Sequence, residues 1–201
     1  MAAKGSSSPQ TAPGDLPLGP GRIALVVGPS GAGKDAVLQN VGARLAQDHR
    51  FVFPRRIVTR TATAAEDHDA ISTDDFDSRL KSGAFALHWE AHGLSYGISA
   101  QMDDAVRQGS TVVFNASRQV IAEVKSRYNC FVVLVDAPRQ IRAERLAARN
   151  RERPEGVSAR LERVVAGFSA HECDFIVENT GTLAEASEQL VRWLLAHIGA
   201  R

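Results

Sequence analysis

Gly28-Pro29-Ser30-Gly31-Ala32-Gly33-Lys34 is a glycine-rich run that ends in a lysine. It follows the apolar residues 23–27, which are typical of a buried strand, and precedes a helical pattern of apolar residues from Asp35 onward. Glycines let a backbone turn its N–H groups around phosphate oxygens, where side chains would block the approach. This order predicts a phosphate-binding P-loop, in which Lys34 reaches the terminal phosphates and the helix N-terminus adds positive charge beneath them.

One residue departs from the usual P-loop pattern. Asp35 occupies the position where a Ser or Thr hydroxyl normally contacts the magnesium ion of the nucleotide. A carboxylate here would repel phosphates unless a cation lay between them, so Asp35 is a candidate magnesium ligand, directly or through water. An acidic residue in a first helical turn is also favourable by itself. Both interpretations of Asp35 stay open on the sequence.

The composition is that of one domain. The chain has 201 residues, 44% of them hydrophobic, and a net charge of +1 that provides no general basic field for nucleic acid or membrane. Cys130 and Cys173 lack metal-ligand spacing, and we expect buried, reduced thiols. Residues 1–21 contain no signal-peptide core, and no later run is as long as a membrane span. We therefore expect a disordered segment over residues 1–21, a single domain over residues 22–201, and a cytoplasmic protein that binds neither nucleic acid nor membrane.

Apolar runs alternate with helical patterns along the chain, which indicates an α/β fold. Strands are expected at residues 51–58 (irregular, because Pro54 lacks a donor), 111–115, 131–135 and 175–177, and helices at residues 35–47, 99–109, 139–151 and 183–194. Such alternation implies a parallel sheet with helices on both faces. Residues 72–98 predict a short helix and two short strands, which would form a small lobe over the substrate.

Polar and cationic residues follow two of the expected strands, at the ends where open parallel sheets bind ligands. The first group consists of Arg55, Arg56, Thr59 and Arg60, and the second of Asn115, Ser117 and Arg118. A solvated basic loop is the alternative for the first group, but the concentration of cations at a strand end favours binding of phosphates.

An arginine-rich helix is expected over residues 139–151. Arg142, Arg145 and Arg149 recur at spacings of three and four, so they share one helical face, and more arginines follow at Arg151, Arg153, Arg160 and Arg163. A solvated helix surface usually mixes charges of both signs more evenly. We therefore predict an arginine-rich lid that clamps phosphates.

These features resemble the guanylate kinase group of P-loop phosphotransferases, and within it the ribose 1,5-bisphosphate phosphokinases, over residues 21–197. The P-loop matches both groups, whereas Lys34-Asp35 is similar to the bisphosphate kinases in particular. The resemblance implies ATP and Mg²⁺ as cofactors and a P-loop kinase fold with a substrate lobe and a lid. It also implies roles for further residues: Lys34, Arg145, Arg149 and Arg160 in catalysis, Asn179 near the adenine of ATP, and Thr59, Arg60, Glu66, Glu90 and Tyr96 on the substrate side.

Departures from the guanylate kinase pattern fall on the part of the site that would recognise guanine. Thr63 stands where a second phosphate-binding Arg is usual, and Ile98 replaces a Ser or Thr that would bond the base. Residues 66–76 are too few to include the usual phosphate-contacting Tyr, and no acidic base reader lies near Asn115. Because the polar edge of a purine would stay unpaired, a ligand with phosphates and no base fits better.

The resemblance implies ATP-dependent phosphorylation of ribose 1,5-bisphosphate, which is a ligand of this kind, and its two phosphates would be shared by Arg55 or Arg56, Arg60 and Arg118. Transfer to its 1-phosphate gives 5-phosphoribosyl 1-diphosphate, and the resemblance implies a place in phosphonate degradation. The six histidines show no ligand spacing, so we expect them at the surface or in packing. The alternatives are a guanylate or other nucleoside monophosphate kinase, an inert interaction module, and a nucleotide switch. An inert module is disfavoured because Lys34 and the lid arginines are present.

Overall fold

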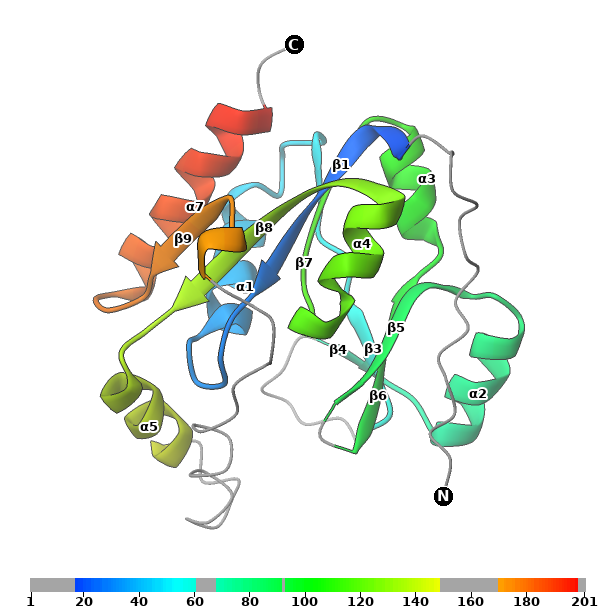
Figure 1. Ribbon diagram of the computed structural model, residues 1–201, viewed down its shortest axis with the longest axis horizontal. Coiled ribbons are helices and arrows are strands. Elements are labelled where there is room, and N and C mark those ends of the chain that lie inside the picture. The colour runs from blue at the N-terminus through cyan, green and yellow to red at the C-terminus, as the bar shows by residue number, and fades with distance from the viewer. Residues whose placement is uncertain (1–16, 61–67, 92, 149–169, 199–201) are drawn as a thin grey trace.

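The chain forms two sheets, seen in the computed structural model of Figure 1. The structure describes residues 17–60, 68–91, 93–148 and 170–198. The larger core sheet is entirely parallel, with strand order β2-β7-β1-β8-β9. The smaller lobe sheet is mixed, with order β4-β3-β6-β5. A parallel sheet with helices and a second small lobe is the α/β architecture that the sequence predicts.

The core sheet is built from apolar strands that are covered on both faces. Its strands are β1 (Leu18–Val27), β2 (Phe51–Val52), β7 (Thr111–Asn115), β8 (Tyr128–Asp136) and β9 (Phe175–Glu178). Residues 23–27 have no exposed surface at all. This near-continuous run of buried apolar residues is expected for a strand in the middle of a doubly covered parallel sheet.

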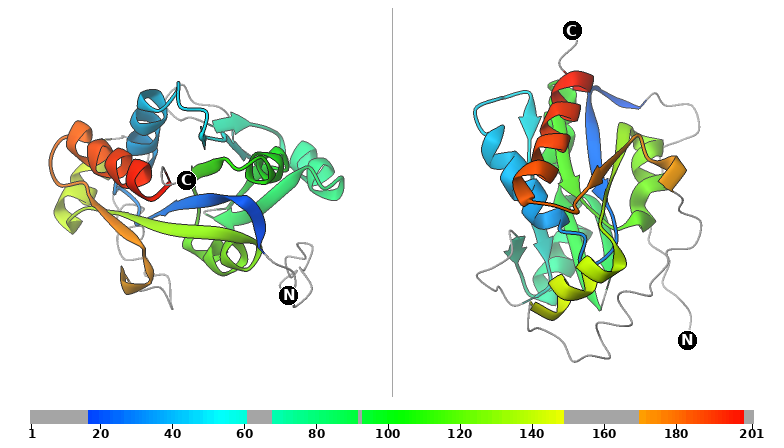
Figure 2. Two further views of the ribbon diagram at one scale, coloured as in Figure 1. Left: turned by 90° about the horizontal axis from the view of Figure 1, so that it is seen from above. Right: turned by 90° about the vertical axis from the view of Figure 1, so that its left-hand side faces the viewer.

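Helices pack on the two faces of this sheet. One apolar cluster joins α1 (Lys34–Arg44) and α7 (Leu183–Ile198) to the sheet, and the other joins α3 (Gln101–Arg107) and α4 (Ile121–Arg127). Figure 2 shows α1 and α7 on one side of the core sheet and α4 on the other. The described part of the chain outside the lobe also contains α5 (Arg139–Ala148) and the short turns η1 (Arg118–Val120) and η2 (Ala170–Glu172).

The sequence-based boundaries need three corrections. Strand β1 begins at Leu18, which pairs with Tyr128, so residues 18–21 belong to the sheet and not to a disordered segment. Helix α1 ends at Arg44, before the expected residue 47. The single irregular strand expected over residues 51–58 is two strands in different sheets, because β2 stays in the core sheet and Pro54, which has no N–H to donate, separates it from the lobe.

The lobe sheet consists of β3 (Arg56–Val58), β4 (His68–Ala70), β5 (Phe85–Ala91) and β6 (Leu94–Ser99), together with α2 (Thr73–Lys81). The Ser72 hydroxyl caps α2 by accepting a hydrogen bond from the Asp75 N–H at 3.1 Å. Phe76 of this helix stacks on Phe85, with ring centroids 4.6 Å apart. The short helix and the two strands over residues 72–98 are therefore where the sequence predicts them.

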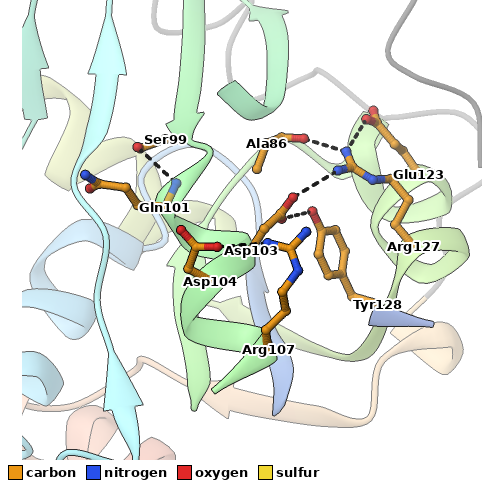
Figure 3. A network of polar contacts seen from close by, with 9 residues as sticks. All are labelled: Ala86, Ser99, Gln101, Asp103, Asp104, Arg107, Glu123, Arg127 and Tyr128. Atoms are coloured by element: carbon orange, nitrogen blue, oxygen red, sulfur yellow. Dashed lines mark hydrogen bonds and ion pairs between the residues drawn. The ribbon is translucent and has the colours of Figure 1, made fainter. Parts of the chain in front are cut away.

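A network of polar contacts fastens the lobe to the core (Figure 3). The Tyr128 hydroxyl donates to Asp103 Oδ1 at 2.6 Å, and the Arg127 guanidinium donates to the Ala86 carbonyl in β5. Arg127 also lies 3.8 Å from Asp103 Oδ2. Burial and the bond to Asp103 raise the pKa of Tyr128, so its hydroxyl stays a donor. These contacts join α3, α4, β5 and β8 at one point.

Two smaller observations concern the expected environment of the chain. Within the described residues, none of the helices has both the length and the apolar composition to cross a membrane. Cys130 and Cys173 are free thiols, but both are half-buried and not fully enclosed. Burial raises the pKa of Cys130 to about 12, so its thiol stays protonated at neutral pH.

Candidate functional site

The P-loop lies between β1 and α1 at the carboxyl end of the core sheet, next to α5 (Figure 1). The Lys34 ammonium donates to the carbonyl oxygens of Gly28 at 2.9 Å and Pro29 at 3.0 Å, so it is folded back over the loop. Gly28 and Gly31 have φ angles of 150° and 81°. A Cβ at Gly31 would lie 2.7 Å from the Arg142 carbonyl oxygen, and one at Gly28 would collide with the Val135 carbonyl. The loop therefore needs glycine to pass this close to β8 and α5.

Side chains from α5 and from the residue after β9 donate hydrogen bonds to the backbone of the loop. The buried Asn179 amide donates to the Ala32 carbonyl at 2.8 Å. Arg145 donates to the same carbonyl at 3.4 Å and to the Asn179 carbonyl at 3.1 Å. Arg145 thus reaches the P-loop, whereas the Asn179 side chain holds the loop backbone. Contact of Asn179 with adenine stays a prediction.

The residue after the P-loop lysine makes contacts that the sequence did not predict. Asp35 Oδ1 accepts a hydrogen bond from Arg56 Nη2 at 2.7 Å and one from Asn115 Nδ2 at 2.6 Å. Asn115 can reach it because β7 pairs with β1 in a register that sets Asn115 beside Val26, two residues before the loop. The structure therefore brings together Lys34, Asp35, Arg56 and Asn115, which the sequence placed in separate roles.

The lobe side of the site is formed by β3 and β6. Tyr96 lies under Arg56, with the guanidinium carbon 6.0 Å from the ring centroid, and stacks on Trp89 at 5.4 Å. The Thr59 hydroxyl accepts from the Ser95 N–H at 2.8 Å, a bond within the lobe. Glu90 is exposed on β5, in register with Ser95. The stacked rings of Tyr96 and Trp89 limit the directions in which the Arg56 guanidinium can point.

The lobe arginines surround a histidine that the sequence analysis did not single out. His68 is 5% exposed, at the start of β4 and in register with Arg56. Burial lowers its pKa, and the charges of Arg60, Arg56 and Arg55 lower it further, while Asp35 acts in the opposite direction. His68 is thus neutral at neutral pH. No spacing in the sequence points to His68, because the cations around it come from β3 and from the residues that flank β3.

Arg118 belongs to a different part of the site. It is half-buried, and its pKa is lowered by burial and by the neighbouring charge of Arg142, while Asp136 raises it. Two cations near one another are unfavourable unless an anion binds between them. Since the charges of Arg142 in α5 and Asp136 at the end of β8 act on Arg118, this residue belongs to the α5 side of the site and not to the lobe side. Glu66, Thr63, Arg149 and Arg160 lie outside the described residues, and their roles stay predictions.

Neutral His68 makes stability depend on pH in a definite direction. Its folded-state pKa lies below the ordinary 6.5, so between these two values the unfolded chain binds a proton that the folded protein does not. The free energy of unfolding should therefore fall as the pH is lowered through about 6.5 toward the folded pKa. When the pH is lowered from about 7.5 to about 5.5, we expect the thermal unfolding midpoint to decrease less in His68→Gln than in wild type.

Thermal unfolding of both proteins across this range is the measurement. His49→Gln is the matched control because His49 is exposed, and it should follow the wild-type curve. An equal loss in wild type and His68→Gln would show that His68 does not contribute to the pH dependence.

Comparison with known proteins identifies the family. The chain matches the guanylate kinase family over residues 21–197. It is 48% identical over 176 residues to the ribose 1,5-bisphosphate phosphokinase PhnN of Bradyrhizobium diazoefficiens, which covers 87% of this chain and 88% of the relative. The protein of the same name from Acidiphilium cryptum is 46% identical over 175 residues, covering 87% and 93%.

A solved structure shares the fold at low sequence identity. The crystal structure of guanylate kinase from Anaplasma phagocytophilum covers 90% of this chain and 87% of its own chain, with a TM-score of 0.65 and 16% identity. This similarity shows that the chain shares the overall fold of that guanylate kinase. The chain belongs to the guanylate kinase family and, within it, to the ribose 1,5-bisphosphate phosphokinases.

Proposed function

We propose that this enzyme transfers the γ-phosphoryl group of ATP to the 1-phosphate of ribose 1,5-bisphosphate, forming 5-phosphoribosyl 1-diphosphate and ADP. The observation that supports it most directly is the contact between Asp35 and Arg56 at 2.7 Å. It ties a lobe arginine to the first turn of α1, at the residue that follows the P-loop lysine, so that a cation for the acceptor would lie next to the loop proposed to bind ATP. Cations in this arrangement suit a doubly phosphorylated acceptor.

The chemistry needs positioning and charge neutralisation more than proton transfer. An oxygen of the acceptor's 1-phosphate attacks the γ-phosphorus, the bond from that phosphorus to the β–γ bridging oxygen breaks, and ADP leaves with the bond electrons. A phosphate monoester with a second pKa near about 6 is already largely ionised at neutral pH, so no general base is required. Lys34 and the loop N–H groups would bind the ATP phosphates, and Arg56 and Arg60 the acceptor.

Mg²⁺ is proposed to accompany ATP. Among the described residues no three His, Cys, Asp or Glu side chains cluster as a metal cage. Mg²⁺ does not require such a cage, because it is commonly held by substrate phosphates, waters and at most one or two carboxylates. The bound ion would neutralise charge on the β- and γ-phosphates. Asp35 is the carboxylate nearest in sequence to the loop.

The direct test uses the pure protein with ATP and ribose 1,5-bisphosphate. We expect ADP and 5-phosphoribosyl 1-diphosphate in equal amounts, measured by a coupled assay for ADP and by mass spectrometry of the sugar product. ADP release that does not depend on the acceptor would contradict the proposed transfer, because it would represent hydrolysis of ATP.

Arg145 is expected to act on the transferring phosphoryl group as well as on the loop. Arg145→Ala should lower kcat by about tenfold or more and change the Kd of ATP by less, because charge stabilisation counts most where charge develops in the transition state. Kinetics and calorimetric titration with ATP separate the two effects. Arg139→Ala, an exposed position on the same helix, is the control. Equal losses in kcat and in ATP affinity would assign Arg145 to ground-state binding.

A further inference from the structure

Asp35 connects three segments that are far apart in the sequence. It belongs to the first turn of α1, whereas Arg56 begins β3 of the lobe sheet and Asn115 ends β7 of the core sheet. Both partners donate to the same carboxylate oxygen, Oδ1, at 2.7 Å and 2.6 Å. One oxygen therefore ties the phosphate-binding loop to both sheets.

Arg56 is held from a second direction by aromatic rings. Its guanidinium lies over Tyr96, and Tyr96 stacks on Trp89 with an angle of 4° between the ring planes. The Arg56 side chain is only 16% exposed, against 38% for Asp35. A guanidinium that is buried between a carboxylate and a ring has few rotamers available, so its direction is set before any ligand arrives.

We propose that Asp35 is a positioning residue that holds Arg56 for a phosphate of the acceptor and thereby aligns the lobe with the nucleotide loop. This inference rests on the function proposed above. The bond to Asp35 uses one nitrogen of Arg56, and a guanidinium carries five N–H donors in a planar fork. A phosphate can therefore bind the same group along another edge. Because Asp35 directly follows Lys34 in the first turn of α1, this contact links Arg56 to the helix turn that begins with the P-loop lysine.

The two roles considered from the sequence fit these contacts less well. A magnesium ion on Oδ1 would compete with two hydrogen-bond donors, one of them cationic. A helix-dipole contact needs only a negative charge in the first turn, and it does not account for two short bonds to side chains on other strands. The three roles also differ in what they predict for binding and turnover.

The test compares wild type with Asp35→Asn, Arg56→Ala and the double variant. Steady-state kinetics give the KM of ribose 1,5-bisphosphate, kcat and the Mg²⁺ dependence, and calorimetry gives the affinities for MgATP and for the acceptor alone. Asn keeps an acceptor oxygen at this position but loses the charge that orients the guanidinium. We expect Asp35→Asn to raise the acceptor KM by about tenfold and to change the MgATP affinity and Mg²⁺ dependence by less than about twofold.

The double variant tests whether Asp35 acts through Arg56. Arg56→Ala should raise the acceptor KM more than Asp35→Asn does, and the double variant should match Arg56→Ala, because the charge at Asp35 has nothing left to orient. Additive effects of the two substitutions would overturn the proposal. So would a higher Mg²⁺ requirement with an unchanged acceptor KM in Asp35→Asn, which would identify a metal ligand.

A neighbouring ion pair offers a matched control. Asp69 pairs with Arg55 at 3.3 Å, also in the lobe, but its side chain is 53% exposed. Asp69→Asn should leave the acceptor KM near the wild-type value, because an exposed pair orients its arginine weakly. The failure of the proposed function has a separate signature, which is wild-type protein that neither binds nor phosphorylates ribose 1,5-bisphosphate.

Discussion

Lys34→Ala should lower kcat by about 10²–10³-fold without changing the fold, because the lysine ammonium stabilises charge on the transferring phosphoryl group. In the structure this ammonium donates to the loop carbonyls of Gly28 and Pro29, and the side chain is no part of either apolar cluster. Turnover and circular dichroism should therefore respond differently. Coupled assays and thermal unfolding of the pure variant measure both.

Lys81→Ala serves as the control for loss of a lysine, since Lys81 is exposed in the last turn of α2. Its turnover should stay near the wild-type rate. If Lys34→Ala kept more than about a tenth of wild-type turnover, less than about 1.4 kcal/mol of transition-state stabilisation would be involved. Such a result would remove the main support for a catalytic P-loop.

Ribose 1,5-bisphosphate should exceed GMP as an acceptor by about 10⁴-fold in kcat/KM, because a site that leaves the polar edge of a ligand unpaired discriminates strongly against it. Two positions in the structure support this expectation. Ile98 is fully buried in the core and offers no hydrogen bond, and the Asn115 amide donates to Asp35. Ile98 therefore cannot pair with a guanine edge, and the Asn115 NH₂ group already donates to Asp35 in this conformation.

The measurement is ADP release with each acceptor at equal concentration over a range of concentrations, so that kcat/KM is obtained for both. AMP in place of GMP tests whether any purine is accepted. Faster turnover with GMP would falsify the assignment of the acceptor, and the enzyme would then be a divergent guanylate kinase. The Lys34→Ala variant should lose activity with either acceptor, which makes it the control for contaminating kinases.

Local patterns in the sequence were sufficient for most of the fold. The buried runs at residues 23–27, 111–115 and 131–135 became neighbouring parallel strands, because apolar runs of this length are stable only when helices cover both faces. The predicted N-cap of α2 at Ser72 is confirmed, and it was predictable because a cap depends on residues within one turn. The start of β1 differs from the prediction. Residues 18–21 joined β1 through pairing with β8, a partner about a hundred residues away along the chain.

The P-loop and the candidate acceptor arginines could be predicted from local patterns, whereas their mutual arrangement could not. Nothing near Asp35 in the sequence shows that Arg56 and Asn115 would donate to it, because these residues are separated by 21 and 80 positions. His68 likewise became a buried, neutral side chain only when the lobe folded around it. The sequence by itself was enough to predict a phosphate-binding loop, because such a loop is a local conformation set by adjacent glycines and a lysine. Only the tertiary structure decided which charges face one another, because burial and hydrogen bonding between distant strands depend on how the two sheets pack.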